Sequence, residues 1–326
     1  MSVNLRHLRY FVAVVDAGSF SRAAATIRVA QPALSRQVVE LERIVGADLL
    51  VRTARGVHPT EAGEALHREA VAILRQVERL PDIAHSAGGN VEGVVGLGMS
   101  STLASFLSGS FMEACRIAFP QVTLRLTTND SNLLKSRIDA GRIDIALVYE
   151  DDPTPGYSRM LLYRQRLYLV GRGPFADGAT AVPVTGLGEL PLVLPAHPNV
   201  TRFLLDRVFA EAGIVPNMVG EADVMGSLLA AARSGLGDII LPKGDLSDVP
   251  GSGDLLALPI EPPVYLTAAI LSSGETAPSH IAAVVRDLLA RFVFDLMTIS
   301  PPPGAEWIGS EPPMPRRHGE VPKQHL

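Results

Sequence analysis

The chain has 326 residues, of which 47% are hydrophobic and 19% are charged, so it contains enough apolar material for about two domains. This composition excludes a disordered chain, and the single cysteine, Cys115, excludes an internal disulfide framework or a cysteine-rich zinc module. Apolar runs are short, and the N-terminus lacks the order of segments typical of a secretory signal. We therefore expect a cytoplasmic protein without a membrane-spanning helix.

The net charge of −5 is unevenly distributed along the chain. Residues 1–58 contain eight arginines and four acidic residues, a balance of +4, which leaves −9 for residues 59–326. A small basic head on a larger acidic body is compatible with nucleic-acid binding by the head alone.

Three helices are predicted in the basic head. Residues 4–17 carry apolar side chains at three- and four-residue steps, which place them on one helical face. A short alanine-rich helix follows, capped by Ser19 or Ser21. The third helix begins near Pro32, a residue favoured in the first turn, and ends near Val45.

The third helix exposes polar side chains near its N-terminus. Glutamine can both donate to and accept from an adenine edge, and arginine can bind guanine or a phosphate. Serine hydroxyls and free backbone amides can bind phosphate. Two short helices joined by a tight turn, the second with such a face, are typical of a helix-turn-helix. The residues concerned are Gln31, Pro32, Ser35 and Arg36.

A wing is predicted after the third helix. Residues 49–60 suit two short strands around a turn at 54–56. Arg52 and Arg55 would then lie beside the DNA backbone or the minor groove. Each arginine taken alone could equally be a solvated surface charge, whereas the whole set of residues favours DNA binding.

Residues 11–63 resemble the N-terminal domain of LysR-type transcriptional regulators. The motifs that carry the resemblance are GSF (18–20), AAA (23–25), QPALSR (31–36), LE (41–42), Gly46 and TEAG (60–63). The resemblance implies that Gln31, Pro32, Ser35 and Arg36 contact the operator, and that Arg52 and Arg55 lie on the wing. One departure is Ala30, where the family usually has serine; this removes a polar side chain at the start of the recognition helix.

Residues 60–85 read as one long helix. Its apolar residues recur at alternating four- and three-residue steps, at positions 66, 70, 73, 77, 80 and 84. Such a stripe can pack on its own chain or on a second copy, and we favour the second copy because two heads read an inverted repeat. Pro81 should kink or end the helix, and residues 88–90, Gly-Gly-Asn, should form a flexible joint.

From Val91 onward, strand-like segments alternate with helices. Residues 94–149 read as βαβαβ, and residues 190–242 repeat that rhythm. A returning strand at 264–271 and a long helix at 279–297 close the body. Parallel sheets covered by helices, in two lobes that the chain crosses between, predict a hinged cleft.

The body resembles the periplasmic-binding-protein-like effector domain of the same LysR family, and is similar to the branch that contains nitrogen-assimilation and sulfur or aromatic-catabolism regulators. The matching runs are VEGVVGLG (91–98), FP (119–120), IDAGRIDIAL (138–147) and AARSGLGDIILP (231–242). The resemblance covers residues 1 to about 298.

The predicted fold is α/β overall. It comprises a winged helix-turn-helix (1–58), a linker and dimerisation helix (59–89) and a two-lobed effector domain (90–298). Lobe I covers about 91–162 and 268–298, and lobe II about 163–267. The tail, 299–326, has seven prolines from position 301 onward and holds the only tryptophan, Trp307. We expect it to be disordered, although Trp307 could instead dock on the body or on a partner.

The effector should bind where strands end and helix N-termini point inward. Hydroxyls and free amides at such places favour a small, anionic molecule. Each of these hydroxyls could alternatively be an ordinary helix cap, and Arg202 could pair with a ligand carboxylate or with Asp206. The predicted effector-binding residues are Ser100, Ser101, Thr102, Thr128, Thr201 and Phe203.

Signatures of catalysis are missing from the sequence: it has no GxSxG, HExxH, Walker or CxxC motif. Cys115 lies beside apolar residues, which favours a core position over a nucleophile or redox sensor. We expect no enzyme activity, no cofactor and no metal.

The sequence therefore predicts a DNA-binding regulator with a small-molecule effector. The resemblance implies double-stranded DNA with an inverted repeat as partner, self-association as a homodimer or homotetramer, contact with RNA polymerase, and no membrane association. Two alternatives remain open: an enzyme with an attached DNA-binding head, and a ligand-independent nucleoid protein.

Overall fold

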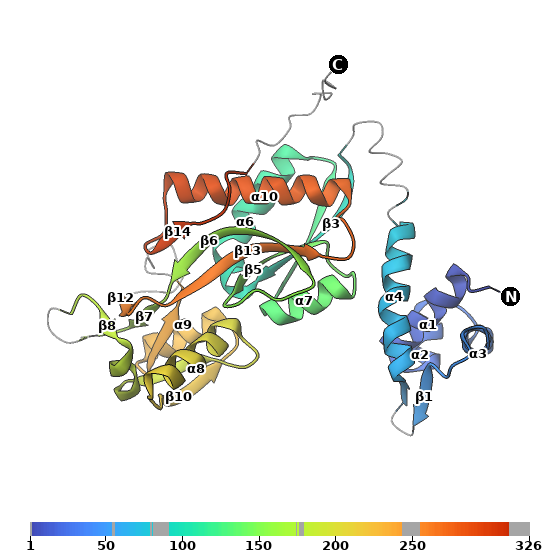
Figure 1. The fold of residues 1–326 in the computed structure, drawn as a ribbon, viewed down its shortest axis with the longest axis horizontal. Helices are drawn as coiled ribbons and strands as arrows, with labels where there is room; N and C mark the ends of the chain where they lie inside the picture. The colour runs from blue at the N-terminus through green and yellow to red at the C-terminus, as the bar shows by residue number, and fades with distance from the viewer. Residues whose placement is uncertain are drawn as a thin grey trace, which may run out of the picture. The chain divides into compact units, whose positions relative to one another are not determined.

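The computed structural model describes residues 2–53, 56–78, 80, 91–173, 175, 179–242 and 255–312. They divide into an N-terminal unit, largely residues 1–84, and a C-terminal unit formed by the residues that follow (Figure 1).

The N-terminal unit has the predicted winged helix-turn-helix. Its elements are α1 (Leu5–Ala17), α2 (Phe20–Thr26), α3 (Gln31–Val45), β1 (Leu50–Thr53), β2 (Gly56–Pro59) and α4 (Glu61–Glu78). Ser19 rather than Ser21 caps α2, since its hydroxyl accepts from the Arg22 N–H. Gly18 and Gly46 end α1 and α3 in the left-handed region, at φ 59° and 77°, which glycine adopts at no steric cost.

The apolar face of α3 fills the centre of this unit. Leu34 and Val38 are buried against residues of α1 and α2, and Leu41 is buried with Phe11 and Leu49. The wing is tied to the turn after α1, because the Val57 N–H donates to the carbonyl of Gly18. Packing from both sides thus fixes which face of α3 points outward.

The apolar stripe of α4 is divided between two environments. Ala70 and Leu74 are buried against Leu8 of α1, whereas Ile73 is 40% and Leu80 is 58% exposed. The start of α4 approaches β1 closely, and a Cβ at Gly63 would collide with the carbonyl oxygen of Leu49. The N-terminal half of the stripe therefore packs on its own chain. The predicted kink at Pro81, the seam position 84 and the joint at 88–90 lie outside the described residues.

The first lobe of the C-terminal unit is a six-stranded sheet in the order β14-β6-β13-β5-β3-β4. Its elements are β3 (Gly93–Ser100), α6 (Ser101–Ala118), β4 (Val122–Asn129), α7 (Ser131–Asp139), β5 (Ile145–Glu150), β6 (Tyr157–Arg166), β13 (Tyr265–Ser273), α10 (His280–Ile299) and β14 (Ala305–Trp307). Every residue of β5 is buried, as expected for a central strand covered on both faces.

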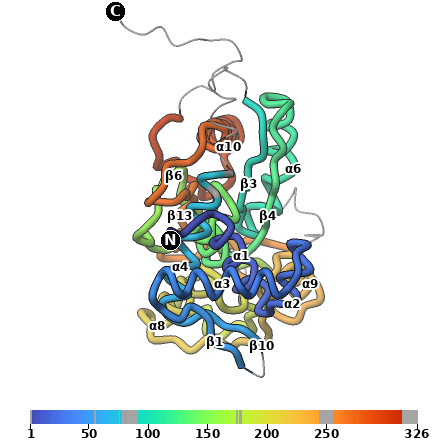
Figure 2. Tube along the Cα trace, turned by 90° about the vertical axis from the view of Figure 1, so that its right-hand side faces the viewer, coloured from blue at the N-terminus to red at the C-terminus, as the bar shows by residue number. Residues whose placement is uncertain are grey.

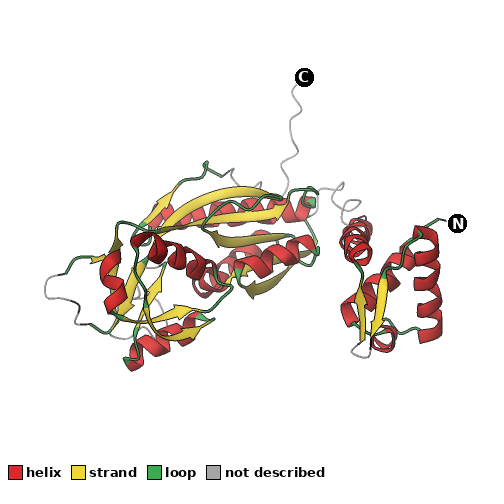
Figure 3. Cartoon of the chain, turned by 60° about the horizontal axis from the view of Figure 1, so that its bottom comes forward, coloured by secondary structure: helices red, strands yellow, loops and turns green. Residues whose placement is uncertain are grey.

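The second lobe is another six-stranded sheet, in the order β10-β9-β11-β7-β12-β8. Its elements are β7 (Tyr168–Gly171), β8 (Val182–Pro183), the 3₁₀ helix η1 (Val184–Glu189), β9 (Pro191–Pro195), α8 (Val200–Ala212), β10 (Asn217–Ala222), α9 (Met225–Ser234), β11 (Asp238–Leu241) and β12 (Leu256–Glu261). Helices and strands of both lobes are distinguished in Figure 3.

The expectation of parallel sheets holds only in part. Strands β3, β4 and β5 are parallel, as are β9, β10 and β11. The chain passes between the lobes twice, and the strands next to these two crossings are antiparallel to their neighbours. Strand β13 is antiparallel to β5 and β6, and β7 is antiparallel to β11 and β12. The reason is that β6 and β13 each carry the chain directly between lobes, without a crossover helix to restore the direction. The crossings fall near residues 166 and 265, a few residues from the predicted lobe limits.

The prediction that residues 299–326 lack regular structure is wrong for their first part. Strand β14 pairs antiparallel with β6, with Trp307 opposite Tyr163, and so forms the edge of the first sheet (Figure 1). The Trp307 ring packs edge-on against Phe294 of α10, with 5.1 Å between ring centroids. Proline is tolerated at a sheet edge, so a proline-rich composition does not exclude a short edge strand. Residues 313–326 lie outside the described part.

Candidate functional site

The first candidate site is the outward face of α3. Gln31, Pro32 and Arg36 are exposed and Ser35 is half-buried, while the opposite face of the helix is buried. Figure 2 shows α3 together with α2 in the N-terminal unit. The Ser21 hydroxyl of α2 donates to Gln31 Oε1 over 3.2 Å, a link between the two helices that the sequence did not predict.

The start of α3 lacks a side-chain cap. Ala30 is the N-cap residue, with extended backbone angles (φ −70°, ψ 129°), and its methyl group accepts no hydrogen bond. The N–H groups of Ala33 and Leu34 both donate to the carbonyl of Ala30. The departure of Ala30 from the usual serine is therefore visible as a missing cap.

The wing contributes one described arginine to this surface. Arg52, on β1, is exposed, and its Nη2 lies 3.5 Å from the Ser35 hydroxyl. Its guanidinium also lies over the Phe20 ring, 4.6 Å from the centroid, a favourable cation–π position. The structure thus brings Arg52 and Ser35 together. Arg55 lies outside the described residues.

The second candidate site is a small cleft between the two lobes of the C-terminal unit. Residues at the N-termini of three helices line it, together with Tyr149 from the end of β5 and Asp223, two residues before α9. The full lining is Ser100, Ser101, Thr102, Asp130, Ser131, Tyr149, Asn199, Val200, Thr201 and Asp223.

The cleft contains four of the six predicted effector residues, Ser100, Ser101, Thr102 and Thr201. Thr128 and Phe203 are not part of its lining. Phe203 is 43% exposed and stacks beside His197, with 4.9 Å between ring centroids.

Six lining residues were missed by the sequence reasoning: Asp130, Ser131, Tyr149, Asn199, Val200 and Asp223. A signal for two of them was present. Asp130 and Ser131 follow β4 just as Ser101 follows β3, and the register pairs Ser100 with Asn129. Because adjacent parallel strands end at one edge of a sheet, the residue pair after β4 had to meet the pair after β3.

Three polar atoms in the cleft are buried without a hydrogen-bond partner among the described residues: Ser100 Oγ, Ser131 Oγ and Asp130 Oδ2. Ser100 is 6% and Ser131 is 2% exposed. Leaving a buried polar group unpaired costs about 1–3 kcal/mol, so the three atoms indicate a place that a polar ligand or water fills.

Asp130 has two contrasting carboxylate oxygens. Its Oδ1 accepts from the Asn132 N–H over 2.7 Å, whereas Oδ2 is the unpaired atom. Burial raises the pKa of Asp130, and the backbone amides of Asn132, Leu133, Ser131 and Val200 act against that rise. Val200 belongs to the second lobe, so the carboxylate of Asp130 interacts with both sides of the cleft.

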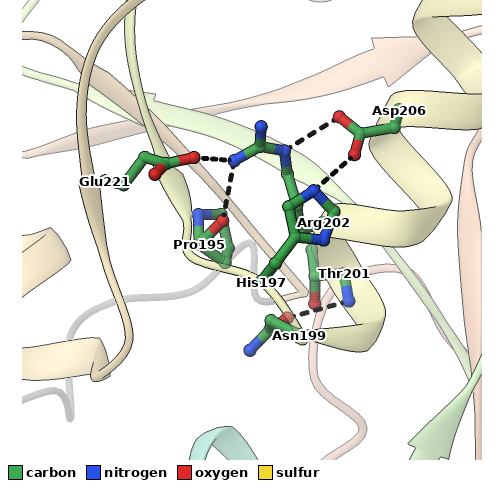
Figure 4. Close-up of polar contacts among 7 residues, drawn as sticks. All are labelled: Pro195, His197, Asn199, Thr201, Arg202, Asp206 and Glu221. Atoms are coloured by element: carbon green, nitrogen blue, oxygen red, sulfur yellow. Dashed lines mark hydrogen bonds and ion pairs between the residues drawn. The ribbon is translucent and has the colours of Figure 1, made fainter.

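Arg202 is engaged by other residues of its own lobe (Figure 4). Its Nε donates to Asp206 Oδ1 over 2.8 Å, and Nη1 contacts Glu221 and the carbonyl of Pro195. The side chain is 11% exposed. The alternative left open by the sequence is therefore decided in favour of Asp206, joined by Glu221.

Tyr149 forms a wall of the cleft. Its hydroxyl lies 3.2 Å from that of Tyr163, and burial raises the pKa of both side chains, that of Tyr163 to about 12. Both tyrosines therefore remain neutral over the physiological pH range.

Cys115 is 1% exposed in the core, as predicted, and burial raises its pKa. No cluster of three metal-ligating side chains occurs in the part of the chain that the structure describes. None of the described helices combines the length and apolar character needed to cross a membrane.

Two family models match the chain. Residues 5–64 match the bacterial regulatory helix-turn-helix protein, lysR family, and residues 88–293 match the LysR substrate binding domain. The chain is 36% identical to the nitrogen assimilation regulatory protein nac of Escherichia coli over 242 residues, 74% of this chain and 79% of that protein. It is 33% identical to nac of Klebsiella aerogenes over 293 residues, 89% of this chain and 95% of that protein.

Solved structures share the fold. A full-length OxyR variant from Pseudomonas aeruginosa superposes with a TM-score of 0.70 at 21% identity, covering 94% of this chain and 98% of that one. Full-length CbnR in complex with its target DNA gives a TM-score of 0.58 at 24% identity, covering 91% and 99%. On the strength of the two matching domains and the identity to the nac proteins, the chain belongs to the LysR family of transcriptional regulators.

Proposed function

We propose that this protein is a sequence-specific transcriptional regulator that binds an inverted-repeat operator in the cytoplasm, and that a small effector in the interlobe cleft modulates its DNA binding or promoter activation. The observation that carries the proposal is the exposed polar face of α3 beside Arg52, in a chain that also holds unpaired buried polar atoms between two lobes.

The DNA contacts are assigned to α3 and the wing. Gln31 and Arg36 contribute to base readout in the major groove, and Pro32 and Ser35 lie at the same face. Arg52 and Arg55 contact phosphate or the minor groove, which adds affinity with little sequence preference. CbnR, a protein of the same fold, has been solved with its target DNA, which supports a DNA-binding role for this chain.

Dimerisation is assigned to α4. Ile73 of α4 and Leu80, two residues beyond its end, are large apolar side chains that remain 40% and 58% exposed. A second copy of the helix can cover them, which places two recognition helices on one operator. We further propose that two such dimers form a tetramer and that the assembly contacts RNA polymerase.

The effector is assigned to the cleft residues Ser100, Ser101, Thr102 and Thr201. Thr128 and Phe203, predicted with them, lie outside the lining of the cleft and are left out of this site. A ligand can shift the two lobes only through a difference in its affinity for their two arrangements. A regulatory cleft is favoured over a catalytic one, since both matching family models describe parts of LysR-type regulators.

Selection of sheared genomic DNA by the purified protein tests the proposal. We expect a few enriched fragments that share an interrupted inverted repeat. Arg36→Ala should lower operator affinity by about 1–3 kcal/mol, roughly 5- to 150-fold, and relax one base preference. Electrophoretic mobility shifts at fixed salt measure both effects.

The control for Arg36→Ala is Arg116→Ala, which removes the same charge from an exposed position of α6. It should leave operator affinity unchanged. Equal loss in both variants would make the effect one of net charge, and absence of any enriched fragment, with and without pooled metabolites, would contradict the proposed function.

A further inference from the structure

We propose that the cleft selects a small zwitterion of the amino-acid class, whose protonated amine binds Asp130 and Asp223 and whose carboxylate binds the N-terminus of α6. This inference rests on the proposed function, in which the cleft is the effector site, and it changes the expected ligand from a simple anion to a molecule that must carry a cation.

The charges around the cleft favour a cation. Its described lining includes two aspartates, Asp130 and Asp223, and no lysine, arginine or histidine. Arg202, the arginine expected to meet a ligand carboxylate, is bound to Asp206, Glu221 and the carbonyl of Pro195. A ligand with only negative charge would therefore meet two carboxylates and no free side-chain cation.

The N-terminus of α7 is already bound by a carboxylate of the protein, that of Asp130. Asp130 is the residue before α7, and its Oδ1 accepts from the Asn132 N–H over 2.7 Å. The Val200 amide, at the start of α8, also acts on this carboxylate from the other lobe. The positive ends of α7 and α8 are thus neutralised by Asp130, and a second anion there would be repelled.

The second oxygen of this carboxylate is a hydrogen-bond acceptor that lacks a donor among the described residues. Asp130 Oδ2 is buried without a partner among the described residues, and an ionised carboxylate can only accept hydrogen bonds. The hydroxyls of Ser100 and Ser131 are buried and unpaired in the same cleft, and each can also accept. A protonated amine brings three donors and a positive charge, which complement these unpaired acceptors.

The N-terminus of α6, which follows β3 beside that of α7 at the same edge of the first sheet, can hold a carboxylate. Ser100 is the N-cap residue of α6, yet its side chain makes no capping hydrogen bond, so the first amides of α6 keep their donors. The hydroxyls of Ser101 and Thr102 lie at the same helix end. This N-terminus has no acidic residue in its first turn and is preceded by Ser100 rather than by an aspartate such as Asp130 before α7, so it can accept a ligand anion.

Isothermal titration calorimetry on the full chain tests the inference. The probes are the twenty standard amino acids, the 2-hydroxy acids that match them, and the amines that lack their carboxylate. We expect at least one amino acid to bind, with its 2-hydroxy acid binding at least tenfold more weakly. A 2-hydroxy acid that binds as tightly as its amino acid, or a set without any binder, would overturn the inference.

Asp130→Asn tests the named residue. Asparagine caps helices as well as aspartate does, so the variant keeps the start of α7 while it removes the charge. Amino-acid binding should weaken at least tenfold. Asp152→Asn, the same change at a side chain that is 71% exposed, should retain it. Unchanged binding by Asp130→Asn would contradict the assignment, and the comparison of probes on the unmodified chain stands even if this variant does not fold.

The two proposals fail separately. Operator selection without ligand reports on the proposed function alone. If operators are selected while no amino acid binds, the ligand class is wrong and the regulator stands; if no operator is selected under any condition, the function itself is wrong.

Discussion

Arg202 shows how strongly neighbours decide the role of a single residue. It opens α8 beside the cleft, where a guanidinium would suit a ligand carboxylate, yet two acidic side chains and a carbonyl occupy its donors. Asp130 is the reverse case: its Oδ1 accepts from the Asn132 N–H at the start of α7, and packing leaves its other carboxylate oxygen buried and unpaired.

Ala30 offers a test of capping at the residue scale. Because its backbone angles suit an N-cap and no side chain caps α3, Ala30→Ser should raise the free energy of unfolding by about 0.5–2 kcal/mol. Urea denaturation followed by circular dichroism measures the change. Thr26→Ser, a similar change at an exposed position of α2, should have a much smaller effect; equal stability of Ala30→Ser and the unmodified chain would show that α3 gains nothing from a cap.

The pH dependence of stability tests the environment of Asp130. Burial raises its pKa above the ordinary 3.8, so the folded state binds this proton more tightly than the unfolded state does. Its contribution favours folding at low pH and is lost as the pH rises through the folded pKa. Asp130→Asn should therefore be stabilising relative to the unmodified chain at pH 7 and not at pH 3. A variant less stable at pH 7 would contradict this.

At the scale of the element, the proline-rich composition of the chain end predicts no regular structure, whereas its contacts with the first sheet produce the strand β14. Strand β14 adds to the edge of a sheet that already exists, so its three residues need little propensity of their own. Glu306 binds Arg164 of β6, with its Oε2 2.8 Å from Nε, and Tyr265 of β13 contacts the same carboxylate. These contacts hold the strand against the first lobe.

The fluorescence of Trp307 reports on this docking, because it is the only tryptophan of the chain. Phe294→Ala removes the ring against which Trp307 packs, so the emission should shift to longer wavelength. The free energy of unfolding should fall by about 1–3 kcal/mol, less than for a fully buried phenylalanine. Ile299→Ala, at a side chain that is 83% exposed, should change neither quantity. An unshifted emission would mean that β14 does not pack on α10.

At the scale of the whole molecule, function depends on assembly. One helix-turn-helix reads a short half-site, so an inverted repeat requires two copies of this chain. On α4, Ala70 and Leu74 pack against Leu8 of α1, whereas Ile73 stays 40% exposed, and we propose that a second copy of the helix covers it.

Ile73→Glu tests the assembly. The side chain is 40% exposed, so the N-terminal unit should keep its fold, while a charge in the dimer seam should shift the chain to monomer in analytical ultracentrifugation. Operator affinity should fall at least tenfold, because both half-sites no longer bind as one unit. Gln76→Glu adds the same charge at an exposed position of α4 and serves as control. An unchanged dimer would move the interface elsewhere.

The sequence by itself determined the family, the helix-turn-helix and the limits of most helices. These follow from local signals such as Ser19, Gly18 and Gly46, each of which acts within one turn of the chain. The rule for strand ends also located Ser100 and Thr201 in the cleft.

Only the tertiary structure decided which polar groups meet in the cleft and which are already paired. The shared cleft lining of Asp130, Ser100 and Asp223, the contact of Arg202 with Glu221 and the docking of β14 all join different elements of the chain. A carboxylate or guanidinium has the same sequence signature whether it is free or bound. Its charge becomes available to a ligand only when packing has excluded water and left no partner within hydrogen-bond reach.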